Sequence, residues 1–165
     1  MKKDVVDDIL DQWSEERPEL DTAPLGVVIR VMALHRSFSR DATKALEPLD
    51  LELWEYDVLS ALRRQGQPFA LAASKLALES DLSAGAMTNR INRLETRNFV
   101  RRRPDKSDRR GVVVHLTSQG KKAIDAAIQC RLDAARSSLQ ALVPAEQKQL
   151  AKLLRKAVLS IRRQS

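Results

Sequence analysis

The chain consists mostly of stretches in which an apolar residue returns every three or four positions, the spacing of amphipathic helices. Helices are expected over residues 4–16, 24–46, 51–64, 70–79, 118–139 and 144–161, with a further one between 83 and 96 whose apolar face is Met87, Ile91 and Leu94. Two shorter stretches, 99–103 and 112–116, have strand-like character and flank a Pro- and Gly-containing turn. The pattern predicts a mainly α fold with a small β-hairpin.

The order of these elements predicts a winged helix-turn-helix. The helices before and after Ser80-Asp81-Leu82 are separated by a tight turn, and the hairpin follows the second helix directly. We expect one domain over residues 1–165, with the winged helix region at 51–117. The segments 1–46 and 118–165 would have little to pack on alone, so they are predicted to be dimerisation helices of a homodimer that binds two half-sites.

The charge is distributed unevenly and indicates a nucleic-acid partner. The 165 residues carry a net charge of +7, and the segment from Ser83 to Arg110 alone contains nine Lys and Arg against three Asp and Glu. A basic balance favours a polyanion such as double-stranded DNA. Only 4% of the residues are aromatic, which argues against an RNA-stacking surface.

Other classes of protein find little support in the sequence. It has one cysteine and no long apolar run, so we expect a cytoplasmic protein without disulfides or a membrane span. No Ser/His/Asp order, metal motif or Gly-rich phosphate loop is present, so neither an enzyme nor a cofactor or metal site is predicted.

The run from Ile91 to Gly120 is similar to the MarR family of bacterial winged-helix regulators. The resemblance rests on NFVRRRPD, on Asp108-Arg109-Arg110-Gly111 in the wing, and on Leu116-Thr117 followed by Gly120. Asn98 stands where relatives usually have Gly, and Asn tolerates a left-handed turn. The resemblance implies a homodimer, an operator with approximate two-fold symmetry, and DNA affinity modulated by a small molecule.

The polar face of the helix and the wing supply the candidate DNA contacts. For the recognition face we select Ser83, Thr88, Asn89 and Arg93, because Asn and Arg can form bidentate bonds to bases. Arg109 and Arg110 at the wing tip are candidates for the minor groove, and Asp108 is expected to pair with one of them and stiffen the loop. Three further cations are either phosphate contacts or solvated charges: Arg101, Arg103 and Lys106.

A second set of residues suggests a ligand site. Arg90 and Arg102 are expected to point inward, Asp57 lies alone in an apolar run and could pair with them, and Trp13 could add a flat wall. The set Trp13, Asp57, Arg90 and Arg102 resembles the site of the urate-responsive MarR subgroup, which also has an extra N-terminal helix. It suits a planar, anionic ligand, although a buried salt-bridge network would account for the same residues.

Together these features favour a repressor that a small aromatic or anionic compound releases from a pseudo-palindromic operator. The alternative is an architectural or low-specificity DNA-binding protein without a ligand switch, which would show a steep salt dependence and no preferred site. Activation in place of repression also remains open.

Overall fold

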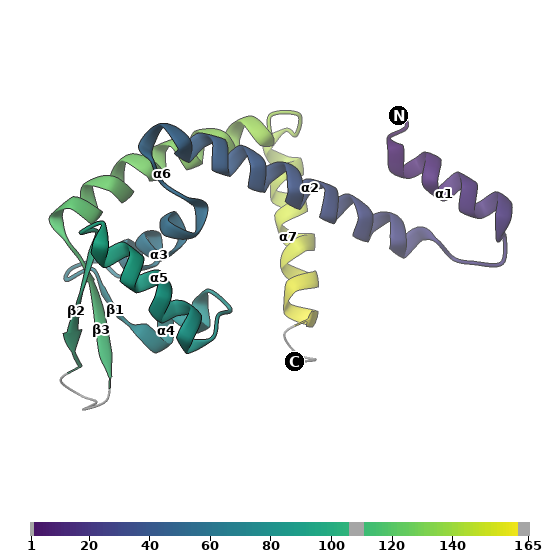
Figure 1. The fold of residues 1–165 in the computed structure, drawn as a ribbon. Coiled ribbons are helices and arrows are strands. Elements are labelled where there is room, and N and C mark those ends of the chain that lie inside the picture. Colours follow the sequence, from purple (N-terminus) through teal and green to yellow (C-terminus); the bar gives the residue numbers. More distant parts are fainter. Residues whose placement is uncertain (1, 106–110, 162–165) are drawn as a thin grey trace. The chain divides into compact units, whose positions relative to one another are not determined.

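The structure, a computed structural model, describes residues 2–105 and 111–161 (Figure 1). The chain divides after Asp41 into two compact units, which are described separately below.

The first unit contains α1 (Val5–Glu16) and most of α2 (Ala23–Leu46). Asp4 caps α1 by accepting hydrogen bonds from the amides of Val6 and Asp7. Arg30 of α2 donates to the carboxylates of both Asp4 and Asp7, at 2.9 and 2.6 Å. The helices also approach closely at Gly26, where a Cβ would lie 2.7 Å from a methyl carbon of Leu10. The acidic start of α1 is therefore tied to α2 by one arginine.

The second unit contains the winged helix. After a short 3-10 turn (Glu47–Leu49), its elements are α3 (Leu53–Arg64), β1 (Ala70–Ala72), α4 (Ala73–Glu79), α5 (Ala84–Thr96), β2 (Val100–Pro104), β3 (Val112–Leu116), α6 (Ser118–Ser138) and α7 (Pro144–Ile161). The strands form an antiparallel sheet in the order β1-β3-β2. In Figure 1, β2 and β3 project from the helices as a wing.

The core of this unit is built from the apolar faces that the sequence periodicity predicts. Met87, Ile91 and Leu94 of α5 are buried against side chains from α3, α4, the sheet and α6. The largest fully buried apolar side chains around them are Leu46, Val58, Leu59, Leu62, Leu76, Val114 and Ile124. The side of α5 that faces away from this core is therefore exposed.

The expected helix over residues 70–79 begins three residues later than predicted. Ala70, Leu71 and Ala72 form β1 and pair with His115, Val114 and Val113 of β3. Because β2 satisfies only one side of β3, the other side offers unpaired backbone groups, and pairing with them outweighs the helix preference of a short Ala-Leu-Ala segment. The hairpin is therefore part of a three-stranded sheet.

The remaining architecture confirms the prediction of a mainly α, winged helix-turn-helix fold. α4 and α5 pack against each other and are joined by residues 80–83, with Asp81 in the left-handed conformation at φ 52°. Asn98, after α5, has φ 55°, as expected for a residue in a position that favours Gly. No helix among the described residues is long and apolar enough to cross a membrane.

Candidate nucleic-acid interface

The exposed side of α5 presents small polar side chains. Ser83 caps the helix, and its hydroxyl accepts a hydrogen bond from the amide of Ala86. Thr88 and Asn89 lie on the exposed face, opposite the buried Met87, Ile91 and Leu94. The side-chain amide of Asn89 is therefore free to contact another surface. The hydroxyl oxygen of Ser83 already accepts one hydrogen bond, from the helix cap.

Arg93, on the same exposed side, has two partners from the start of α3. Its Nη2 donates to Oε1 of Glu52 at 2.5 Å, and its guanidinium carbon lies 4.6 Å from the centre of the Trp54 ring. Trp54 Nε1 donates to the other carboxylate oxygen of Glu52. These hydrogen bonds, that from Trp54 above all, hold the pKa of Glu52 below its usual value. Sequence reasoning did not identify these partners, because Glu52 is 41 residues away.

Arg97, one turn further along, is fixed more firmly. It donates to the carboxylate of Glu55 and to that of Asp50, both at 2.7 Å, and it lies over the ring of Phe99. Glu55 is only 1% exposed, and its second bond comes from the backbone amide of Glu52. This pair locks the end of α5 to the start of α3. It is a structural ion pair that the sequence analysis missed.

The sequence predicts that Arg102 pairs with Asp57, and the structure shows a different partner. Arg102 joins β2 to α5 by donating to Glu95 at 2.7 Å, to Asn92 at 2.6 Å, and to the backbone carbonyl of Thr88. Glu95 also accepts from the backbone amide of Arg102. An inward arginine needs an anion, and the carboxylate of Glu95 on α5 supplies it. Arg102 thus ties the wing to α5.

The wing presents its positive charge along β2. Arg101 and Arg103 alternate with Arg102 and are exposed. They lie near His115 of β3, and desolvation together with these two cations lowers the pKa of its imidazole. The wing-tip residues predicted to meet DNA lie outside the described residues: Lys106, Asp108, Arg109 and Arg110.

Asp57 and Arg90 line one hollow, of about 300 Å³, between α3, α4 and α5. Its other lining residues are Ala61, Arg64, Glu79 and Ser80. Asp57 as a whole is exposed, but partial burial of its carboxyl raises the pKa of that group. The positive charges of nearby arginines lower the pKa and offset this effect only in part. Trp13 lies on α1 in the first unit, with 45% of its surface exposed. Two members of the predicted ligand set therefore come together within the second unit.

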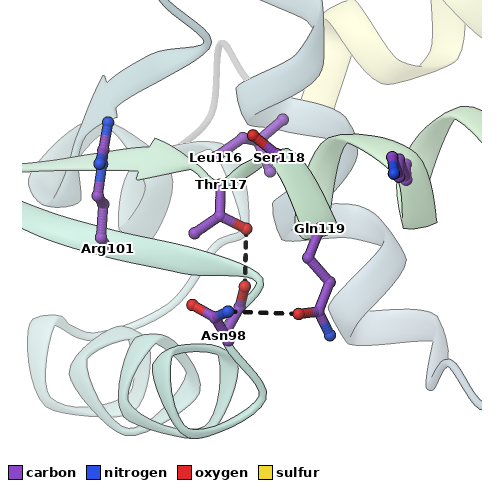
Figure 2. Close-up of a pocket in the computed structure, with 7 residues that line it drawn as sticks. Asn98, Arg101, Leu116, Thr117, Ser118 and Gln119 are labelled. Atoms are coloured by element: carbon purple, nitrogen blue, oxygen red, sulfur yellow. Dashed lines mark hydrogen bonds between the residues drawn. The ribbon is translucent and has the colours of Figure 1, made fainter.

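Another hollow, of about 710 Å³, lies where the wing meets α6 (Figure 2). Figure 2 shows two hydrogen bonds in its lining: the Thr117 hydroxyl donates to the backbone carbonyl of Asn98, and the side-chain amide of Asn98 donates to the side chain of Gln119. The remaining lining residues are Arg101, Leu116, Ser118 and Lys122. These hydrogen bonds join the turn after α5 to the start of α6, so we assign these side chains a structural role. Within the described part of the chain, no group of His, Cys, Asp or Glu could hold a metal ion.

Comparison with known proteins identifies the family. The model of the MarR family matches residues 49–111, which span the helix-turn-helix and the start of the wing. The transcriptional regulator PecS of Dickeya dadantii is 32% identical over 149 residues, covering 90% of both chains. The chain belongs to the MarR family. Members of this family are transcriptional regulators and not enzymes.

Solved structures of MarR-family proteins share the fold. AbsC of Streptomyces coelicolor superposes with a TM-score of 0.79 at 24% identity, over 87% of this chain and 97% of AbsC. A mutant of MarR from Escherichia coli, complexed with operator DNA, superposes with a TM-score of 0.72 at 26% identity, over 88% and 96% of the two chains. The winged helix described above thus shares its fold with a MarR structure that contains operator DNA.

Proposed function

We propose that this MarR-family protein is a homodimeric, sequence-specific repressor that a small aromatic or anionic ligand releases from a pseudo-palindromic operator. The observation that carries the proposal is the exposed polar face of α5, with Thr88 and Asn89 outward in a winged helix-turn-helix. An asparagine amide can form two hydrogen bonds to adenine in the major groove. The relative with operator DNA, MarR, supports the same use of this fold here.

The proposed contacts divide into those that read bases and those that hold the backbone. Ser83, Thr88, Asn89 and Arg93 would face the major groove, where some of them would bind phosphates only. Arg101, Arg103 and Lys106 would contact phosphates, and Arg109 or Arg110 would enter the minor groove with Asp108 stiffening the loop.

The proposed dimer is supported by large apolar side chains on α2 and α7 that are exposed among the described residues. On α7 these are Leu153, Leu154, Val158, Leu159 and Ile161, and no described residue of this helix is buried. On α2 they are Leu25, Val27, Val28, Val31, Met32 and Leu34. Exposed apolar surface of this extent marks an interaction site, and a two-fold dimer would present two α5 helices to two half-sites.

The proposed ligand site is the hollow at Asp57 and Arg90. Arg90 would attract an anionic group, and the carboxyl of Asp57 could accept from, or donate to, a ring nitrogen or oxygen. Because Arg90 belongs to α5, a ligand that binds it would shift the recognition helix between two positions. The roles of Trp13 and of Arg102 toward a ligand stay predictions.

The test is fluorescence-anisotropy binding to the DNA upstream of the protein's own gene and to a scrambled duplex at physiological salt. We expect the specific duplex to bind about 10³-fold more tightly. Urate, xanthine or salicylate would weaken only that complex. An Arg90→Ala variant should still bind the specific duplex but lose the response.

Three outcomes are informative. Equal binding to both duplexes would contradict repression of its own gene and favour a low-specificity binder. Specific binding that no compound weakens would contradict the ligand switch alone. A response retained by Arg90→Ala would contradict the proposed site.

A further inference from the structure

Glu52 binds Arg93 of α5 directly and also orients the Trp54 ring beside it. It lies immediately before α3, and one oxygen of its carboxylate accepts from Arg93 at 2.5 Å while the other accepts from Trp54 at 2.6 Å. The Trp54 ring, which this second bond orients, lies 4.6 Å from the Arg93 guanidinium carbon. Arg93 therefore rests on a carboxylate and an indole that are bonded to each other.

This ion pair is open to solvent, where a phosphate can compete for the cation. The side chains of Arg93 and Glu52 are 61% and 56% exposed. Exposed pairs are weak, so the guanidinium can exchange one anion for another at small cost. The bond from Trp54 lowers the pKa of Glu52, so the hydrogen bond favours the charged form that holds Arg93.

Arg97, directly after α5, lacks this freedom. Arg97 is bound to the buried Glu55, which would be left as an uncompensated charge if the arginine turned away. Arg90 lines the hollow beside Asp57 and lies 5.5 Å from the Trp54 ring. Arg93 of α5 therefore has an exposed carboxylate partner that a phosphate can replace.

We infer that Glu52 is a specificity-determining residue, because its carboxylate reduces the affinity that Arg93 would gain from contact with any phosphate. This inference rests on the DNA-binding function proposed above. A free arginine gains affinity from any duplex by releasing counterions, whereas a paired one is already neutralised, and the carboxylate beside it repels phosphates. The loss weighs most on non-specific DNA, which binds through phosphates alone, and less on a site whose bases make further bonds with α5.

The test compares wild type with Glu52→Gln in anisotropy titrations across a range of salt concentrations, on the upstream duplex and on the scrambled duplex. Glutamine keeps the side-chain length and an oxygen for Trp54, but it removes the charge that holds Arg93. We expect scrambled DNA to bind about fivefold more tightly, with a salt slope steeper by about 0.9, the value for one added phosphate contact. The upstream duplex should gain less, so the ratio of the two affinities should fall.

Two further variants separate this effect from a change in net charge. Asp133→Asn removes an exposed carboxylate that is likewise paired with an arginine, Arg136, but lies on α6. It should leave the salt slope close to wild type. The double variant Glu52→Gln/Arg93→Gln should bind scrambled DNA no more tightly than Arg93→Gln alone.

An unchanged salt slope in Glu52→Gln would overturn the inference, and so would an equal change in Asp133→Asn. Failure of the proposed function would appear differently, in the wild type itself, as equal binding to both duplexes.

Discussion

At the junction between the wing and α6, the backbone of Phe99 leaves no room for a side chain on Gly120. A Cβ at this position would lie 2.0 Å from the Phe99 carbonyl oxygen and 2.8 Å from its carbon. The same carbonyl accepts from the amide of Thr117, whose hydroxyl accepts from the amide of Gly120. The glycine of the family signature is therefore explained by close approach of the backbone.

We predict that Gly120→Ala lowers the free energy of unfolding by about 2–3 kcal/mol, because strand or helix must move to relieve the clash. The measurement is urea denaturation at a fixed protein concentration. Gly85→Ala is the matched control: it lies in α5, and an added Cβ meets nothing within 4 Å. That change should stabilise the protein by about 0.5–1 kcal/mol. A tolerated Gly120→Ala would contradict the packing described here.

His115 gives the wing a pH dependence. Desolvation and the cations of Arg103 and Arg101 lower its pKa in the folded protein, so the unfolded chain binds the proton more readily. The stability contributed by the neutral imidazole is complete above pH 6.5, the ordinary value, and is lost as the pH falls through the lower, folded-state pKa. We expect urea denaturation to show a smaller loss of stability between pH 7 and pH 5 in His115→Gln than in wild type. Equal losses would contradict this assignment.

At the scale of elements, the wing and the recognition helix are joined by one side chain. Arg102 of β2 binds the carboxylate of Glu95, the amide oxygen of Asn92 and the carbonyl of Thr88, all from α5. Asn92, which is exposed on the helix, is thereby engaged in holding the wing. A change in this link alters the placement of the wing without removing any proposed DNA contact.

We predict that Glu95→Ala weakens binding to the upstream duplex about fivefold, or about 1 kcal/mol. The direction is informative because the substitution removes a negative charge, which by itself would strengthen DNA binding. Anisotropy at physiological salt measures the effect, and circular dichroism checks that the helices are intact. A gain in affinity would show that charge, and not the position of the wing, controls binding.

The helices and the hairpin could be predicted from sequence because their signals are local. The spacing of Met87, Ile91 and Leu94 marks the buried face of α5. Only a few residues separate α4 from α5, which predicts a tight turn between them. β1 could not be predicted in this way, since it is a strand only because β3 is beside it.

The partners of the arginines could not be predicted for a related reason. From the sequence, we select Arg93 for DNA and Arg102 for a ligand site, and we assign Arg97 no role. Their carboxylates come from Glu52, Glu55 and Glu95, and only the last is near in sequence. Ion pairs between distant elements depend on how those elements pack, which periodicity does not encode. Much of the positive charge counted along the sequence is therefore neutralised locally.

At the scale of the whole molecule, the apolar surface of α7 is the feature that a single chain leaves unexplained. Leu154 and Val158 lie one turn apart on the same stripe, and both are exposed. In a two-fold dimer such a stripe would be covered by its symmetry mate or by another helix of the partner.

We predict that Val158→Glu shifts the protein toward monomer and reduces affinity for the upstream duplex, because a carboxylate would be buried in the interface. Sedimentation velocity measures the oligomeric state. Gln149→Glu adds the same charge on the opposite side of α7 and should remain dimeric. A monomeric wild type, or a dimeric Val158→Glu, would contradict the assignment of this helix to the interface.

The bond between Arg102 and α5 also affects how operators for this protein can vary. Arg102 fixes β2 against α5, so if α5 reads bases and the wing touches the backbone as proposed, the distance between these contacts is set within a single protomer. In the proposed dimer, substitutions in the helices that join two protomers would change only the spacing between half-sites. The length of each half-site would stay fixed, so related regulators could diverge in operator spacing while keeping the same half-site.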